Sequence, residues 1–277
     1  MMYLRTWLLW TLWVGTAWAQ QPPLLDAHSH YTATDARQLS PSHIIAKLDA
    51  AGVSRAVITS APPLLARELH SHAPQRIIPL LGAYSTDADK ARWMHDPELP
   101  TRTAALAALG GWAGIGELHL FAQDAGSPVF AELVRIAATH NLMLLIHGDP
   151  EVLDRAFEIA PTVRILWAHL GTVPEPAAVE RVLQRHANKA LWVDTSVRDD
   201  RIAPGGQLLP AWRQLFEAHP ARFVVAVDTF STQRWRRYGE ITTHIRQWVG
   251  GLPTELQERL LWRNAEALFE PWLSRHP

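Results

Sequence analysis

The 277-residue sequence contains no cysteine, which excludes both a disulfide framework and a lipid-modified cysteine at an export cleavage site. It also lacks an excess of either charge, because 26 Lys and Arg residues face 27 Asp and Glu residues. A near-neutral chain without a basic stripe gives no reason to expect nucleic acid or an anionic membrane as a partner.

The N-terminal apolar stretch, residues 7–18, is too short for a membrane anchor, since a spanning helix needs roughly 20 residues. Arg5 precedes this stretch, and Ala17-Trp18-Ala19 ends it as an A-x-A cleavage site. This order predicts a secretory signal peptide over residues 1–19 and a mature chain that begins at Gln20. We expect an exported protein, secreted or in a bacterial periplasm, that has no membrane association after cleavage.

Several catalytic motifs are absent as well: a G-x-S-x-G elbow, a Ser-His-Asp arrangement, a phosphate-binding glycine loop and a dinucleotide-binding motif. What the sequence does contain is an alternation of apolar, strand-like runs with helical patterns. Such an alternation predicts α/β structure, a single-domain (β/α)8 TIM barrel over residues 20–277. The eight runs begin near Leu24, Arg55, Ile77, Gly114, Met143, Arg164, Ala190 and Phe223.

Connections between these elements give further expectations. The two longest irregular connections, 85–102 and 195–210, follow the third and seventh runs, so they should lie over the catalytic mouth of a barrel. The last helix, about 254–273, is amphipathic, and we expect it to pack on the outside of the barrel.

Five of the apolar runs end in residues of the type that binds metal ions. Alternate residues of a strand share a face, so His28 and His30 at the end of the first run predict two adjacent imidazoles. Neutral imidazoles are common ligands of first-row metals. Because barrel enzymes build their sites at the C-terminal ends of strands, the other run-ending residues should gather there. They are Glu117, His147, His169 and Asp228.

With this pattern the chain resembles the amidohydrolase superfamily of metal-dependent hydrolases, and its segment 264–269 resembles the closing helix of the amidohydrolase-2 branch. The resemblance implies a divalent metal, with zinc as the expected ion. It assigns His28, His30 and Asp228 to one ion, His147 and His169 to a second, and Glu117 to a bridging position. Carboxylated-lysine members of the superfamily have a modified lysine where this chain has Glu117, so the number of ions, one or two, stays open. In single-metal members the residue that corresponds to His169 is a catalytic or polarising group.

Asp26 precedes His28 by two residues, so strand alternation predicts that both side chains share a face. We expect its carboxylate to point into the barrel and to orient a ligand imidazole. A buried structural carboxylate is the alternative.

Further residues near strand ends are candidates for contact with substrate. His119 shares a face with Glu117, one step nearer the mouth. Tyr84, Arg198 and Arg201 follow the third and seventh runs and can reach a substrate carboxylate or carbonyl. An ordinary loop hydrogen bond for His119 and solvent-exposed arginines are the alternatives.

The resulting hypothesis is that a metal-activated water cleaves an ester, lactone, amide or related bond of a small-molecule substrate, with Asp228 as the group that takes up a proton and returns it to the leaving group. Non-oxidative decarboxylation at one metal is the second hypothesis, since part of the amidohydrolase-2 branch uses a related site. A non-catalytic metal-binding barrel is the third. The sequence does not indicate the oligomeric state.

Overall fold

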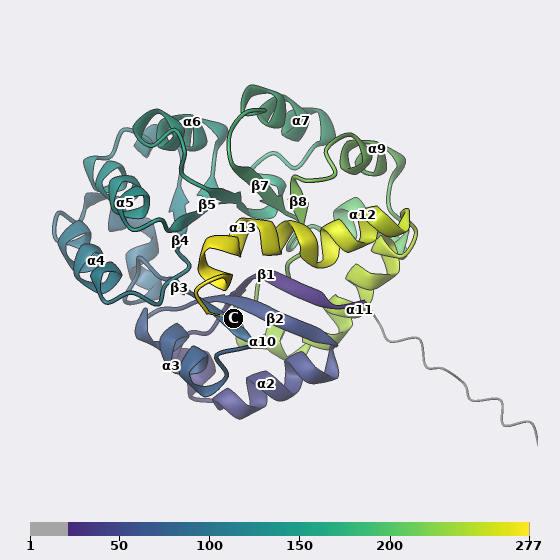
Figure 1. The fold of residues 1–277 in the computed structure, drawn as a ribbon, viewed down its shortest axis with the longest axis horizontal. Coiled ribbons are helices and arrows are strands. Elements are labelled where there is room, and N and C mark those ends of the chain that lie inside the picture. The colour runs from purple at the N-terminus through teal and green to yellow at the C-terminus, as the bar shows by residue number, and fades with distance from the viewer. Residues whose placement is uncertain (1–21, 277) are drawn as a thin grey trace, which may run out of the picture.

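The computed structural model describes residues 22–276, so the predicted signal peptide over residues 1–19 lies outside the described residues. Eight parallel strands are paired in chain order, and helices surround them (Figure 1). The strands are β1 (Leu24–His30), β2 (Val53–Thr59), β3 (Ile77–Leu81), β4 (Gly114–Leu120), β5 (Met143–Gly148), β6 (Ile165–Trp167), β7 (Leu191–Asp194) and β8 (Phe223–Val224). Every predicted run begins within two residues of one of these strands, and the predicted (β/α)8 barrel is confirmed.

Helices fill the connections. Proline is the first residue of several of them, where its fixed φ and missing N–H fit the helix start. The α-helices are α1 (Ala33–Ala36), α2 (Pro41–Ala50), α3 (Leu64–His72), α4 (Leu99–Ala108), α5 (Pro128–Thr139), α6 (Pro150–Ile159), α7 (Pro176–Arg185), α8 (Asp199–Ile202), α9 (Pro210–Ala218), α10 (Thr232–Arg236), α11 (Tyr238–Val249), α12 (Thr254–Glu258) and α13 (Asn264–Leu273). The long connections after β3 and β7 hold short helical turns, including η2 (Trp93–His95). Within residues 22–276, none of the helices has the length and apolar character needed to cross a membrane.

The barrel closes between β8 and β1 through the backbone. The Ala27 N–H donates to the Val225 carbonyl at 3.3 Å, and the Asp228 N–H donates to the His28 carbonyl at 2.6 Å. These bonds lie beyond the short β8 and carry the pairing toward the C-terminal end of the barrel. They also bring the backbone of Asp228 next to that of His28.

The closing helix does not pack where we expected. Its apolar side chains, among them Leu268 and Phe269, join the cluster of inward-facing strand residues. The Arg164 guanidinium, at the start of β6, donates to the Leu268 carbonyl. Figure 1 shows α13 lying across the middle of the ring of strands. The helix therefore covers the N-terminal end of the barrel, because this opening exposes apolar surface that no strand can bury.

Candidate active site

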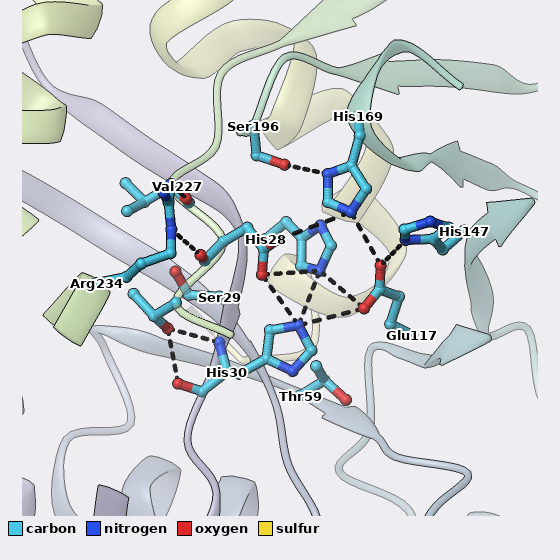
Figure 2. A network of polar contacts seen from close by, with 12 residues as sticks. His28, Ser29, His30, Thr59, Glu117, His147, His169, Ser196, Val227 and Arg234 are labelled. Atoms are coloured by element: carbon cyan, nitrogen blue, oxygen red, sulfur yellow. Dashed lines mark hydrogen bonds and ion pairs between the residues drawn. The ribbon is translucent and has the colours of Figure 1, made fainter. Parts of the chain in front are cut away.

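The six predicted metal-ligating residues meet at the C-terminal end of the barrel, and Figure 2 labels five of them, all but Asp228. Four of them lie in β1, β4 and β5, while the short turn after β6 and the segment after β8 contribute the other two. All six side chains are buried or nearly so; the His147 side chain is the most accessible, at 29%. The residues are His28, His30, Glu117, His147, His169 and Asp228.

A local irregularity of β4 aims Glu117 into the barrel. The pairing of β4 with β5 shifts register between Ile115 and Leu118, as it does at a bulge. Gly116 has φ +146° there, and a Cβ at this position would lie 2.5 Å from the Leu145 carbonyl oxygen. Only glycine fits such a backbone. Glycine at 116 therefore allows the turn of the strand that presents Glu117.

The Glu117 carboxylate divides its contacts between two groups of imidazoles. Its Oε2 lies 3.3 Å from His30 Nε2 and 3.7 Å from His28 Nε2. Its Oε1 lies 3.0 Å from His147 Nδ1 and 3.2 Å from His169 Nε2. Figure 2 shows the two groups on either side of this carboxylate. One buried anion thus contacts four ring nitrogens.

Asp228 faces the first group. Its Oδ1 lies 3.2 Å from His30 Nε2 and 3.9 Å from His28 Nε2, and its Oδ2 lies 3.8 Å from His169 Nε2. Oδ1 is buried and makes no hydrogen bond with the described residues. The nitrogens His28 Nε2 and His30 Nε2 are only 3.2 Å apart. The side chains of these three residues thus converge on a small polar space.

Asp194, which the sequence analysis missed, positions the imidazoles of His28 and His169 from the side that faces away from Glu117. Its Oδ2 lies 3.1 Å from His28 Nδ1, and its Oδ1 accepts from the His169 backbone N–H at 3.0 Å. The Ser196 hydroxyl donates to the same Oδ1, so its oxygen accepts from His169 Nδ1 at 2.8 Å. Both imidazoles then carry a proton on Nδ1, and in the neutral rings each Nε2 presents a lone pair to the centre of the site.

Asp26 does not take the role that we predicted for it. The register of β1 against β2 shifts between Asp26 and Ser29, which breaks the alternation on which the prediction relied. The carboxylate instead accepts from the hydroxyls of Ser29 and Tyr238, at 2.6 and 2.8 Å, and from the Val227 backbone N–H. Asp26 is therefore a structural anchor between β1, α11 and the segment after β8.

Electrostatics within the site keep its carboxylates charged. Burial alone would raise the pKa of Glu117, but the surrounding imidazoles hold this pKa well below its usual range. Burial lowers the pKa of His28, yet the Glu117 and Asp228 carboxylates outweigh burial and raise this pKa well above its usual value. The Asp228 pKa is lowered against the effect of burial, chiefly by His28 and His30. The Glu117 and Asp228 carboxylates therefore favour positive charge at the ring nitrogens that face them.

The predicted substrate-contacting residues lie at the edge of this cluster. The Tyr84 hydroxyl contacts His119, whose Nε2 is 3.5 Å from Glu117 Oε2. Burial lowers the pKa of the His119 ring to about 2, so this imidazole is neutral. Arg198 donates through Nε to the His169 carbonyl at 3.2 Å, whereas Arg201 pairs with an exposed glutamate of the preceding connection.

Arg234 is a second residue that sequence analysis missed. Its Nε donates to the Asp228 carbonyl at 2.6 Å and its Nη2 to the Val227 carbonyl at 2.5 Å. Asp228 has φ +55°, a left-handed conformation that is uncommon outside glycine. Such a conformation persists only where its surroundings hold it. The Arg234 guanidinium supplies that support.

Three groups of side chains bring potential metal-ligating atoms within 4.8 Å of one another. One contains His28, His30 and Asp228, the set predicted for a single ion. The second group contains His28, His169 and Asp194. The third contains Glu117, His119 and His147. Nitrogen and carboxylate oxygen ligands of this kind suit zinc and related divalent ions.

Comparison with solved structures finds similar barrels at low sequence identity. A probable 2-pyrone-4,6-dicarboxylic acid hydrolase from Acinetobacter baumannii, with citric acid bound, is 16% identical, with a TM-score of 0.61 over 89% of this chain and 99% of that one. An amidohydrolase from Burkholderia multivorans with bound zinc is 14% identical, with a TM-score of 0.59 over 90% of this chain and 99% of that one. A mutant of a PTE-like lactonase from Deinococcus radiodurans is 15% identical, with a TM-score of 0.57 over 90% of this chain and 95% of that one. These similarities concern the fold.

No curated protein matches the sequence significantly. A family model described as Amidohydrolase matches residues 15–270, which is most of the chain. The match agrees with the barrel and with the histidines and acids at its C-terminal end. The chain therefore belongs to the amidohydrolase family of hydrolytic enzymes.

Proposed function

We propose that this protein is a metal-dependent hydrolase that cleaves an ester, lactone, amide or related bond of a small molecule, with two zinc ions as the expected cofactor. One observation carries the proposal: the two oxygens of the buried Glu117 carboxylate face two different pairs of imidazoles. A carboxylate in this position can offset the repulsion between two cations about 3.5 to 4 Å apart.

The side chains fit such ions. Asp194 and Ser196 fix the protons of His28 and His169 on Nδ1, so both Nε2 lone pairs point toward carboxylates. A lone pair and an anion repel each other unless a proton or a metal ion lies between them. The buried Asp228 Oδ1 makes no hydrogen bond with residues 22–276, although it lies 3.2 Å from His30 Nε2, so it is an additional atom that can bind an ion.

In this proposal His28, His30 and Asp228 hold one ion, and His147 and His169 hold the other. Glu117 would contribute Oε2 to the first and Oε1 to the second. When bound, such ions polarise a carbonyl group and lower the pKa of water from about 15.7 to about 7.

Asp228 is the proposed proton carrier. Its lowered pKa keeps it ionised at neutral pH, so it can accept a proton from the attacking water. It can then deliver this proton to the leaving group, and Arg234 holds its backbone in place for both steps. In a single-metal site, where His169 would bind no ion, the same ring, fixed by Ser196, would instead hold its Nε2 toward the reacting group.

The names of the similar structures guide the first assays, since they include a zinc-bound amidohydrolase, a pyrone dicarboxylic acid hydrolase and a PTE-like lactonase. A panel of lactones, esters, amides and phosphoesters should reveal a substrate. Hydrolysis in ¹⁸O-labelled water should then place the label in the product. Release of carbon dioxide without label would contradict hydrolysis and favour the decarboxylase alternative.

A further inference from the structure

The connection after β3 and the strand β4 meet at a pair of hydrogen bonds that involve one phenol and one imidazole. The backbone N–H of His119 donates to the Tyr84 hydroxyl oxygen at 2.7 Å. The same hydroxyl lies 3.0 Å from Nδ1 of the His119 ring. Tyr84 is buried, and the Trp93 indole N–H donates to the His119 carbonyl at 2.9 Å. Both residues are thus held in place.

These contacts decide which ring nitrogen of His119 carries the proton. A backbone N–H is always a donor, so the Tyr84 oxygen accepts from it. Among residues 22–276, Nδ1 of His119 is the one other group that hydrogen-bonds the buried Tyr84 hydroxyl, so the single phenol proton has only Nδ1 as an acceptor. Nδ1 of His119 is therefore the acceptor, and a neutral ring carries its proton on Nε2. This arrangement is opposite to that of His28 and His169, whose Nδ1 atoms donate to Asp194 and Ser196 and whose Nε2 atoms face the carboxylates of the site.

The Nε2–H of His119 points toward the metal-ligating residues. It lies 3.5 Å from Glu117 Oε2, too long for a strong hydrogen bond, and the ring stacks on His147 with centroids 4.3 Å apart. A protonated ring nitrogen has no lone pair for a metal ion. Its proton remains available for an oxygen atom that enters the site.

We propose that His119 is a catalytic hydrogen-bond donor, which uses Nε2–H to bind an oxygen of the substrate's reacting group, and that Tyr84 is the positioning residue that fixes this tautomer. The inference rests on the proposed hydrolytic function and specifies which group of the substrate His119 binds. The ligand is an oxygen acceptor such as the carbonyl of an ester or lactone. A donor already oriented toward such an oxygen needs no reorganisation during reaction.

The tautomer can be measured without metal or substrate. In protein labelled with ¹⁵N at histidine, the signals that disappear in His119→Gln identify this ring. We expect its Nε2 to be protonated and its Nδ1 to be bare, and we expect Tyr84→Phe to abolish this preference. A bare Nε2 in the wild type would overturn the inference. Because this measurement uses metal-free protein, it decides the tautomer even if the proposed hydrolytic function fails.

Kinetics and metal analysis of the zinc-loaded enzyme test the role. We expect His119→Ala to lower kcat by about 10²-fold, the loss typical of one such donor, while the zinc content stays that of the wild type. Tyr84→Phe should lower kcat with little change in KM. His43→Gln, on the exposed face of α2, is the control and should behave like the wild type. Loss of zinc from His119→Ala, or an unchanged kcat, would overturn the donor role.

Discussion

Replacement of Arg234 by methionine tests how the fold holds Asp228 in place. The change keeps part of the aliphatic stem but removes the guanidinium, which lies over the Phe230 ring, and with it the two N–H donors to the Val227 and Asp228 carbonyls. Both residues are buried, and no other donor among residues 22–276 reaches these two oxygens. A buried acceptor left without a partner costs about 1 to 3 kcal/mol. Since water can reach part of this site, we expect Arg234→Met to lower the free energy of unfolding by about 2 to 4 kcal/mol.

Urea unfolding of metal-free protein, followed by circular dichroism, measures this loss. Arg237→Met is the matched control, because the Arg237 pair with Glu240 on the same surface is mostly exposed and should contribute little. Arg234→Lys should be intermediate, since an ammonium group cannot reproduce the fork of the guanidinium. Zinc affinity should fall in Arg234→Met as Asp228 leaves its left-handed conformation. Equal unfolding midpoints for Arg234→Met and Arg237→Met would refute the reasoning.

Four further predictions follow from the site and its surroundings. Asp194→Ala should weaken zinc binding by about 10- to 100-fold, because His28 and His169 lose the acceptor that orients them; unchanged affinity in a zinc titration would argue against this role. Burial raises the pKa of Asp199 to about 6 from 3.8, despite a hydrogen bond from the Trp248 indole. Asp199 therefore stabilises the fold most below pH 3.8, and this contribution of about 3 kcal/mol is lost as the pH rises through 6. Asp199→Asn should abolish that pH dependence in urea unfolding measured between pH 4 and 8, whereas parallel curves for the two proteins would contradict the assignment. His28→Ala and Asp228→Ala should each lose most of the bound metal and the activity while circular dichroism shows an intact fold, and full metal content in both would reject the site. Finally, we propose that the chain is exported and cleaved after Ala19, so the intact mass of protein from the cell envelope should correspond to a chain that begins at Gln20; a cytosolic protein that retains Met1 would contradict this.

Strand ends were the features that the sequence predicted best. Apolar runs that end in His28, Glu117 or His147 needed only strand alternation and the chain order of a parallel barrel to converge. Asp194 carries a similar signal, since it ends the apolar run of β7. The family resemblance names positions for Glu117 and Asp228 but none for an acid at the end of the seventh run, so the sequence alone does not single out Asp194.

Other features depended on geometry that the sequence does not specify. With the bulge in β1, the Asp26 carboxylate contacts the His28 backbone N–H and not the His28 ring, and neither residue type nor spacing predicts such a register shift. The apolar face of α13 fits the end of the barrel as well as its side, because periodicity gives the face and not its partner. Tyr84 and His119 are 35 positions apart in the sequence. Each could be predicted as a substrate-contacting residue, but the hydrogen bond between them could not.

Metal stoichiometry tests the central claim most directly. Wild-type protein and Glu117→Ala, both stripped of metal and titrated with zinc, should differ in the number of ions bound per chain. The shared carboxylate predicts two ions in the wild type and at most one in Glu117→Ala, with activity falling together with the second ion. A wild type that binds a single ion, together with full activity in Glu117→Ala, would contradict the two-metal site.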